Sequence, residues 1–325
     1  MLGGVPEERR QRDRRGGMEI LVLGAAAGGG FPQWNCNCHN CRGFWAGEPG
    51  LVAQTQSSIA VSADGRRFCL FNASPDLRQQ IERNPALHPR DGLRDSPIRA
   101  AVLTNGDVDH VAGLLNLRES QPLALYATGR IHEVLRANTV FNVLNPDFVD
   151  RRAFRLGEGV DLAERDGTPM GLRLTVFPVP GKVALWLEDS AAGDNFGTVD
   201  EDTVGLEIAD GDGRRVYYIP GCARMTDDLA RRLEGADAVF FDGTLWTDDE
   251  MIRQGVGMKT GQRMGHMSIS GPKGTMAAFR DLNIGRRIFI HLNNTNPVLR
   301  ADAPERREIE AAGWEVAHDG MTVRP

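Results

Sequence analysis

TNGDVDHVAG, residues 104–113, is the stretch that decides the fold of this 325-residue chain. It joins an apolar, strand-like run at 99–104 to an amphipathic, helix-like run at 110–119. Three ionisable side chains crowd the junction, namely Asp107, Asp109 and His110. Because binding and catalytic residues gather in loops at strand ends, this junction is the first candidate for a functional site.

The composition is that of an ordinary globular protein, with 41% hydrophobic and 25% charged residues. The formal net charge is −6 and no basic stripe alternates with aromatic residues, so we expect no nucleic-acid partner. No apolar run reaches the roughly 20 residues of a transmembrane helix, so we expect no membrane partner. Three of the 5 cysteines lie close together, which favours a metal site in a reducing compartment, and the cytoplasm is the expected location.

Residues 1–17 are polar and arginine-rich and lack the apolar segment of a secretory signal. We expect a disordered tail there, with Met18 as an alternative start. Beyond it, single helix-like stretches alternate with β-like runs. The β-like runs are EILVLG, SIAVS, FCLFN, RAAVLT, LRLTVFPV, VGLEI, RVYYIP, DAVFFDG, RRIFIHL and WEVAHDG. The helix-like stretches are PDLRQQIERN, HVAGLLNLRES, residues 129–138, TDDLARRLEG, GPKGTMAAFRDL and PERREIEAAG, with capping side chains expected at 74–76 and 226–228. The pattern predicts an α/β fold in one domain, 18–325, with sheets inside and helices outside.

The cysteine cluster WNCNCHNCRG contains Cys36, Cys38 and Cys41 on a polar, loop-like segment. Three thiolates at this spacing predict a structural zinc site, which needs a fourth ligand. The fourth ligand is expected from distant sequence, and the candidates are His266, Asn294 and His318, with Asn294 preferred because it lies in the amide-rich loop after His291. Cys69 lies in an alternating strand run and is expected in the core.

Three of the 7 histidines stand at positions where a functional role is expected. His110 opens a helix directly after two carboxylates, His291 closes the strand RRIFIHL, and His266 lies in the glycine- and methionine-rich loop MGHMSIS. The remaining histidines are expected to be structural.

Seven motifs that follow one another from Met18 onward resemble a known family. They are GAAAGGGFPQWNCNCHNC, NASPDL, TNGDVDHVAG, YIPGCAR, FFDGTLW, GHMSISG and FIHLNNTNP. Together they resemble the pyrroloquinoline quinone biosynthesis protein B family of the metallo-β-lactamase fold superfamily, whose HxHxDH signature also follows a strand and opens a helix. The resemblance implies an αββα sandwich, in which two mixed sheets pack face to face with helices outside.

The sequence departs from the dinuclear hydrolases of that superfamily at one of their two metal sites. Asn105 and Asp107 replace the first two signature histidines, Gly181-Lys182 stands where a later histidine is expected, and Cys222 replaces a bridging aspartate. Cys222 is either an additional ligand or a nearby thiol, and Asp107 is a further candidate ligand.

The ligands of the other metal site remain, and they are Asp109, His110 and His291. Two histidines and one carboxylate with open positions form the ligand set of mononuclear non-haem Fe(II) oxygenases, although Zn²⁺ or Mn²⁺ also suits such a site. A mononuclear zinc site would instead favour a hydrolase with a metal-activated water.

The resemblance implies a role in building the quinone cofactor from the glutamate and tyrosine of a ribosomal peptide. The implied reaction is hydroxylation of the tyrosine ring in the cross-linked Glu-Tyr intermediate, with Fe(II) and O2. Two alternatives stay open, namely a carrier of the finished cofactor and a phosphodiesterase-like hydrolase. The expected partners are the peptide-derived precursor and O2, with a homodimer as the candidate assembly.

Further polar residues are expected around the metal. Asp242 ends the strand of FFDGTLW, where it either orients a ligating imidazole or caps a turn. His266 is expected to be a general acid or base, or to hydrogen-bond the substrate. Four basic residues suit a carboxylate-rich substrate, namely Lys182, Arg224, Lys259 and Arg263. Lys182 and Arg224 are preferred, and Asn105 is grouped with them as a substrate-binding residue.

Overall fold

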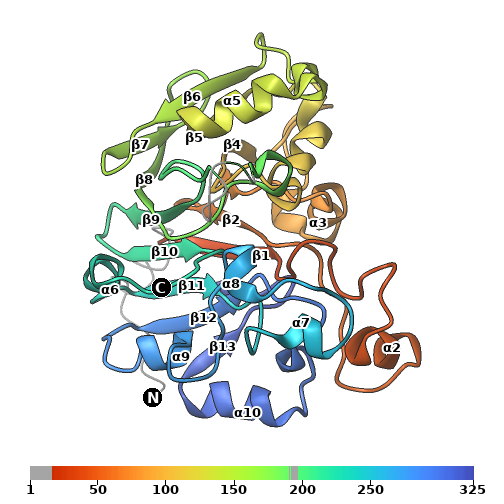
Figure 1. The fold of residues 1–325 in the computed structure, drawn as a ribbon. Coiled ribbons are helices and arrows are strands. Elements are labelled where there is room, and N and C mark those ends of the chain that lie inside the picture. Colours follow the sequence, from red (N-terminus) through yellow and green to blue (C-terminus); the bar gives the residue numbers. More distant parts are fainter. Residues whose placement is uncertain (1–16, 190, 192–196) are drawn as a thin grey trace, which may run out of the picture.

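Two sheets of seven strands form the centre of the computed structural model, which describes residues 17–189, 191 and 197–325 (Figure 1). The expected tail lies outside these residues, apart from Gly17. The first sheet has the order β14 (Thr322–Val323), β1 (Glu19–Gly24), β2 (Ser58–Ser62), β3 (Phe68–Phe71), β4 (Ile98–Val102), β5 (Leu123–Thr128) and β6 (Val149–Phe154). The second has the order β13 (Trp314–Val316), β12 (Arg286–Ile290), β11 (Ala238–Asp242), β10 (Arg215–Ile219), β9 (Val204–Asp210), β8 (Pro169–Pro178) and β7 (Gly159–Ala163).

Each sheet combines a run of parallel strands with a run of antiparallel strands. Strands β3 to β6 pair in parallel, as do β10 to β13, while the other pairs are antiparallel. The loops that follow parallel strands meet at one edge of a sheet, which is where ligands bind in open α/β sheets.

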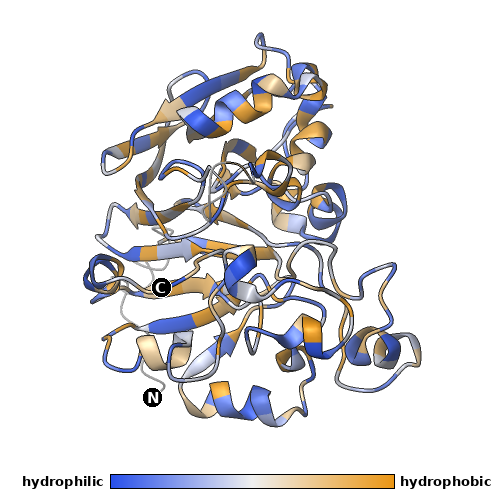
Figure 2. Cartoon of the chain, viewed as in Figure 1, coloured by the Kyte–Doolittle hydropathy of each residue, from blue (hydrophilic) through white to orange (hydrophobic). Residues whose placement is uncertain are grey.

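Helices cover the outer faces of the two sheets. The first sheet is covered by α3 (Leu77–Arg83) and α5 (Gly129–Ala137), and the second by α6 (Asp227–Leu233), α9 (Thr275–Ala278) and α10 (Pro304–Ala311). Shorter helices lie in the loops: α2 (His39–Trp45), α4 (Val108–Val111), α7 (Glu250–Arg253), α8 (Gly261–Met264), η1 (Pro85–Leu87), η2 (Ala112–Arg118), η3 (Thr139–Val143), η4 (Leu185–Leu187) and η6 (Pro297–Leu299). The α10 helix is mostly hydrophilic in Figure 2, and Ile309 is its one buried residue.

The central strands bury both of their faces, and this arrangement produces the layers. Because side chains alternate along a strand, Ile20 and Val22 of β1 face the second sheet, in a core cluster that also contains Tyr218. Leu21 and Leu23 face the opposite way and pack with α3 and α5. A third cluster joins the outer face of the second sheet to α6 and α10. Three apolar layers between four structural layers are those of an αββα sandwich, so the predicted fold class is confirmed.

The helix expected at 110–119 is interrupted, which corrects the sequence-based prediction. α4 ends at Val111, and the chain continues as the 3-10 helix η2. Gly113 explains the change, because its N–H donates to the Ala73 carbonyl at 2.9 Å and a Cβ there would lie 2.1 Å from the Ser74 carbonyl oxygen. The loop after β3 is therefore packed directly against the backbone of the metal-binding segment.

One of the two expected helix caps is present. Thr226 accepts a hydrogen bond from Leu229 N at the start of α6. At α3 the prediction is wrong, because the Asp76 carboxylate accepts from the backbone and side chain of Gln56 and does not cap the helix. Strands β5, β6, β7 and β14 were not predicted. No helix among the described residues is long and apolar enough to cross a membrane.

Candidate metal centre and its surroundings

Five polar residues from separate parts of the chain lie close together at the ends of strands and helices. Asp109 and His110 lie in α4 after β4, His291 directly follows β12, Asp242 ends β11, and His266 follows α8. Their ligand atoms form two overlapping groups, Asp109–His110–His291 and Asp242–His266–His291, and within each group the atoms lie within 4.8 Å of one another. The sequence neighbours Asp109 and His110 thus meet a histidine from the other sheet.

The first group has the geometry of a metal site. His291 Nε2 lies 3.2 Å and His110 Nε2 lies 3.8 Å from the same oxygen, Asp109 Oδ2. His110 Nε2 is buried and has no hydrogen-bond partner among the described residues. Since nearly all buried polar atoms in proteins have partners, an orphan imidazole nitrogen beside a carboxylate fits a bound cation.

The second nitrogen of each ligand histidine is held by a protein acceptor. His110 Nδ1 donates to Asn105 Oδ1 at 2.7 Å. Thr244 Oγ1 donates its single proton to Asp242 Oδ1 at 2.7 Å, so it accepts from His291 Nδ1 at 2.8 Å. Both rings therefore direct an unprotonated Nε2 towards Asp109, as metal-binding histidines do.

The electrostatics agree with a neutral His110 beside an ionised Asp109. Burial lowers the pKa of His110 to about 4 against the opposing charge of Asp109, so the ring is neutral at pH 7. Burial raises the pKa of Asp109, but His110 and His291 outweigh it and hold that pKa below its ordinary value. A neutral imidazole and an ionised carboxylate are the ligand forms that bind metals.

His291 occupies a strained backbone conformation. Its φ of 63° lies in the left-handed region, which costs a non-glycine residue about 1–2 kcal/mol. Hydrogen bonds from Leu292 N to Ala25 O (2.8 Å) and from Asn293 N to Thr244 O (3.0 Å) hold the following residues in place. The fold thus maintains a turn that aims the imidazole back across the strand ends.

The second group is a hydrogen-bonded acid–base pair rather than a ligand set. His266 Nδ1 lies 2.7 Å from Asp242 Oδ2 and 3.1 Å from Thr244 Oγ1. Burial lowers the pKa of His266, but Asp242 outweighs it and raises that pKa above its ordinary value. Burial also raises the pKa of Asp242, and His266 brings it below its ordinary value. Each partner therefore favours the charged form of the other, and the His266 ring stacks on His291 with centroids 5.2 Å apart.

The three clustered cysteines converge on one point at the start of α2. Asn294 Nδ2 lies 3.0, 3.6 and 3.4 Å from the sulfurs of Cys36, Cys38 and Cys41. Of the fourth-ligand candidates, Asn294 is the one at this cluster, because His266 lies at the metal centre and His318 is exposed. Burial and the neighbouring thiols raise the pKa of Cys38 to about 12, although a backbone N–H opposes this. A thiolate at Cys38 is therefore favoured by a nearby cation, which a zinc ion would supply.

Comparisons with known proteins agree with this geometry. The profile of the Beta-lactamase superfamily domain matches residues 67–292. The coenzyme PQQ synthesis protein B of Methylorubrum populi is 56% identical over 306 residues, which covers 94% of this chain and 99% of the relative. The corresponding protein of Methylobacterium nodulans is 56% identical over 307 residues, covering 94% and 100%. This chain belongs to the coenzyme PQQ synthesis protein B family.

Solved structures place the fold in the same family. The crystal structure of Zn²⁺-bound PqqB from Methylobacterium extorquens superposes with a TM-score of 0.90 at 55% identity, covering 94% of this chain and 100% of that one. A diphosphatase of the PhnP family superposes with a TM-score of 0.64 at 19% identity, covering 95% and 98%, and shares the fold.

In this member of the PQQ synthesis protein B family, Asn105 and Asp107 are tied to protein partners. Asn105 Oδ1 accepts from His110 and from Asp107 N, so its oxygen holds a ligand histidine, whereas the sequence placed Asn105 with the substrate-binding residues. Asp107 Oδ1 accepts from Leu185 N at 3.1 Å. Burial and the neighbouring Asp109 raise the pKa of Asp107.

Cys222 is next to Asp242. Among the described residues it belongs to neither of the two groups of possible metal ligands. Its N–H donates to Asp242 Oδ2 at 2.9 Å, and its thiol donates to the Arg224 carbonyl at 3.2 Å. Burial raises the pKa of Cys222 to about 12, which keeps the thiol neutral. The structure therefore places it as a nearby thiol that supports Asp242.

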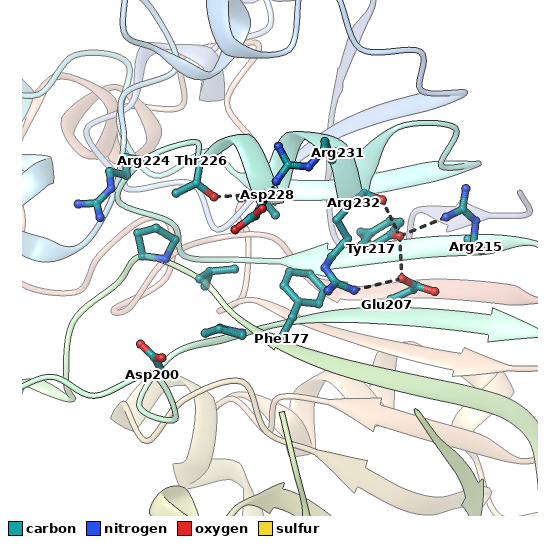
Figure 3. A pocket seen from close by; sticks show the side chains of 14 residues that line it. Phe177, Asp200, Glu207, Arg215, Tyr217, Arg224, Thr226, Asp228, Arg231 and Arg232 are labelled. Atoms are coloured by element: carbon teal, nitrogen blue, oxygen red, sulfur yellow. Dashed lines mark hydrogen bonds and ion pairs between the residues drawn. The ribbon is translucent and has the colours of Figure 1, made fainter. Parts of the chain in front are cut away.

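Lys182 and Arg224, the two basic residues assigned to the substrate, lie in different parts of the structure. Lys182 Nζ lies 3.3 Å from Glu188 Oε1. Arg224 is exposed and lines a separate cavity of about 790 Å³ between α6 and β8–β10, shown in Figure 3, whose lining includes none of the residues of either ligand group. In that view Arg224 stands at the edge near Thr226, away from Tyr217 and Glu207.

Sequence reasoning missed two residues that organise the site. Thr244 contacts Asp242, His266 and His291, and its motif FFDGTLW was recognised only for the aspartate. Glu188 pairs with Lys182 and Arg263 from a segment that carries no motif. For Thr244, its place two residues after Asp242 is a signal that could have identified it. For Glu188 the sequence carries no such signal.

Proposed function

We propose that this chain acts in coenzyme PQQ synthesis as a mononuclear oxygenase that hydroxylates the tyrosine ring of the peptide-derived Glu-Tyr precursor. The role in PQQ synthesis follows from membership in the family, whose members cited above are 56% identical over 94% of this chain. The reaction itself is inferred from the residues of the metal centre. Its substrates are the precursor and O2, and the free cysteines suit a reducing compartment such as the cytoplasm.

The observation that carries the proposal is the convergence of Asp109, His110 and His291. Fe²⁺ held by two histidines and one carboxylate keeps open positions for O2 and substrate. The replaced positions argue against a second metal: Asn105 and Asp107 are occupied by hydrogen bonds within the protein, and Cys222 directs its thiol to a carbonyl. Zn²⁺ or Mn²⁺ would also bind this set, but neither supplies Fe²⁺–O2 chemistry.

The chain itself supplies a proton relay next to that set. Asp242 accepts a hydrogen bond from His266 Nδ1 and favours the protonated ring, and the His266 side chain is 17% exposed and thus within reach of a ligand. We infer that His266 hydrogen-bonds the ring oxygen of the substrate and exchanges its proton with it, while Asp242 keeps the ring oriented. Thr244 couples this pair to His291 through one hydroxyl.

We infer that the cysteine cluster is a structural zinc site that stabilises the loop carrying His291. Cys36, Cys38 and Cys41 supply thiolates, and Asn294 is the proposed fourth ligand through Oδ1, which would replace Nδ2 beside the sulfurs when the amide turns over. Asn40 Nδ2 also donates to the carbonyls of Asn294 and Asn296 at 3.1 and 2.8 Å. This site therefore ties the N-terminal loop to the segment directly after His291.

The test is anaerobic reconstitution with Fe²⁺, precursor and a two-electron reductant such as ascorbate, followed by exposure to O2. One oxygen atom of O2 would enter the ring, and the electrons of the reductant would convert the other to water. Wild type is expected to give a product heavier by one oxygen atom, and His110→Ala none. His318→Ala is the matched control, because His318 is exposed and its ring contacts only the Asp319 carbonyl among the described residues. Turnover of a phosphodiester without O2 would instead support a hydrolase, and tight product binding without turnover that survives Asp109→Ala would support a carrier.

A further inference from the structure

Two basic side chains near the metal centre share the carboxylate of Glu188. Glu188 accepts from Arg263 Nη2 at 2.7 Å and Nη1 at 3.3 Å, and Lys182 Nζ lies 3.3 Å away. The Glu188 side chain is 12% exposed, so the cluster is more sheltered than a surface ion pair. Hydrogen bonding by Arg263 lowers the pKa of Glu188 to about 2 against its burial, with Lys182 and Lys259 adding to the effect.

This cluster adjoins the residues of the proposed reaction. A Cβ on Gly265 would lie 3.2 Å from Lys182 Cγ, and the next residue is His266. Leu185, between Lys182 and Glu188, donates its N–H to Asp107 Oδ1 on the loop that carries Asp109. The positive charge of Lys182 also acts on Asp107, where it opposes the rise in pKa caused by burial.

We propose that Lys182 and Arg263 are the carboxylate-binding pair of the substrate site and that Glu188 is an internal carboxylate which the substrate displaces. The proposal rests on the proposed function, in which the substrate derives from glutamate and tyrosine and so carries several carboxylates. Both cations direct donors to this one carboxylate, so the carboxylate of an anionic ligand would fit the same place. An arginine fork and a lysine ammonium together suit a carboxylate of that ligand.

Displacement has a thermodynamic consequence that a fixed ion pair lacks. When Glu188 occupies the pair, the apparent affinity for a carboxylate ligand equals the intrinsic affinity multiplied by the fraction of molecules in which the pair is free. Glu188 thus makes the site select ligands that contact both cations strongly. If Glu188 instead only positioned Lys182 and Arg263, replacing its carboxylate by an uncharged amide would weaken binding of the carboxylate ligand.

The test is equilibrium dialysis of pyrroloquinoline quinone itself against wild type, Glu188→Gln and Glu315→Gln. Glu315 is the matched control, because it makes a two-pronged pair with Arg286 at 2.8 Å on strands β12 and β13. We expect Glu188→Gln to bind about tenfold more tightly than wild type, Glu315→Gln to match wild type, and Lys182→Met to lose binding in either background. No turnover is involved, so the outcome is independent of whether the chain is an oxygenase.

Equal or weaker binding by Glu188→Gln would overturn the proposal, as would absence of binding by every variant. Amide hydrogen exchange of wild type gives a second measurement that needs no substitution. If the ligand displaces Glu188, exchange at residues 183–189 rises when the ligand is added. A fall in exchange there would mean that Glu188 keeps its partners, and the proposal would be wrong.

Discussion

Replacing Thr244 by valine should weaken the metal centre without changing any metal ligand. The Thr244 hydroxyl is buried and lies 2.8 Å from His291 Nδ1, 2.7 Å from Asp242 Oδ1 and 3.1 Å from His266 Nδ1. Valine has nearly the same shape, so the change removes hydrogen bonds rather than volume. Asp242 keeps hydrogen bonds from Cys222 N and Thr244 N at 2.9 and 3.0 Å, whereas no other hydrogen bond to His291 Nδ1 is found among the described residues.

The size of the effect follows from the N–H group of His291 Nδ1, which loses its acceptor when Thr244 becomes valine. An unsatisfied buried N–H costs about 1–3 kcal/mol, which is the expected loss in the free energy of unfolding. The His291 ring also loses the contact that fixes its tautomer, and such losses lower metal affinity by roughly 10- to 100-fold.

The assay is anaerobic titration of metal-free protein with Fe²⁺ against a chromophoric chelator. Thr244→Ser keeps the hydroxyl and should bind within a few-fold of wild type. If Thr244→Val bound Fe²⁺ as tightly as wild type, the assignment of His291 Nε2 as the ligand atom would be wrong.

Three other predictions concern the surrounding fold. Asn294→Ala should lower zinc affinity by roughly 10- to 100-fold, measured as chelatable zinc per chain. Gly113→Ala places a Cβ against the Ser74 carbonyl and should cost about 3 kcal/mol in urea unfolding, whereas Gly211→Ala meets no atom within 4 Å and should change stability by less than about 0.5 kcal/mol. Burial raises the pKa of Asp319 from 3.8 to about 6, and its Oδ1 has no hydrogen-bond partner among the described residues. The folded state therefore holds this proton more tightly, so its contribution to stability is largest below about pH 4 and is lost as the pH rises through 6. Asp319→Asn should stabilise the protein by about 1–3 kcal/mol at pH 8 and have little effect at pH 4.

Each of these predictions has an outcome that contradicts it. Full zinc retention in Asn294→Ala would exclude that residue as the fourth ligand. Equal stability of the two alanine variants would show that the loop around Ser74 moves freely to accept a methyl group. A gain from Asp319→Asn that does not depend on pH would mean that the carboxyl group does not change its proton affinity on folding.

The fold was predictable where side chains follow a simple period. The strand-like runs EILVLG and DAVFFDG became β1 and β11, because alternating apolar residues can be buried on both faces. VDRRAF became β6 at the edge of its sheet, and its polar residues give no such signal. The prediction of one continuous helix at 110–119 was wrong from Gly113 onward. The contact that changes the backbone there comes from Ser74, which lies far away in the sequence.

The candidate site was predictable as a set of residue types but not as a set of contacts. Asp109, His110 and His291 were named from their places after strands, and the structure gathers them. Asn105 was assigned to substrate and instead holds His110, because the sequence cannot show which acceptor an imidazole finds. Lys182 was named without Glu188, its partner in the fold.

The central claim is that the precursor gains an oxygen atom from O2 at a single metal held by Asp109, His110 and His291. The direct measurement is a single turnover of Fe²⁺-loaded protein with precursor and a two-electron reductant such as ascorbate under isotopically heavy O2, followed by mass spectrometry of the product. We expect one heavy oxygen atom in the tyrosine-derived ring, and no product from His291→Ala or from Zn²⁺-loaded protein. A product that forms without O2, or that takes its new oxygen from water, would contradict the account.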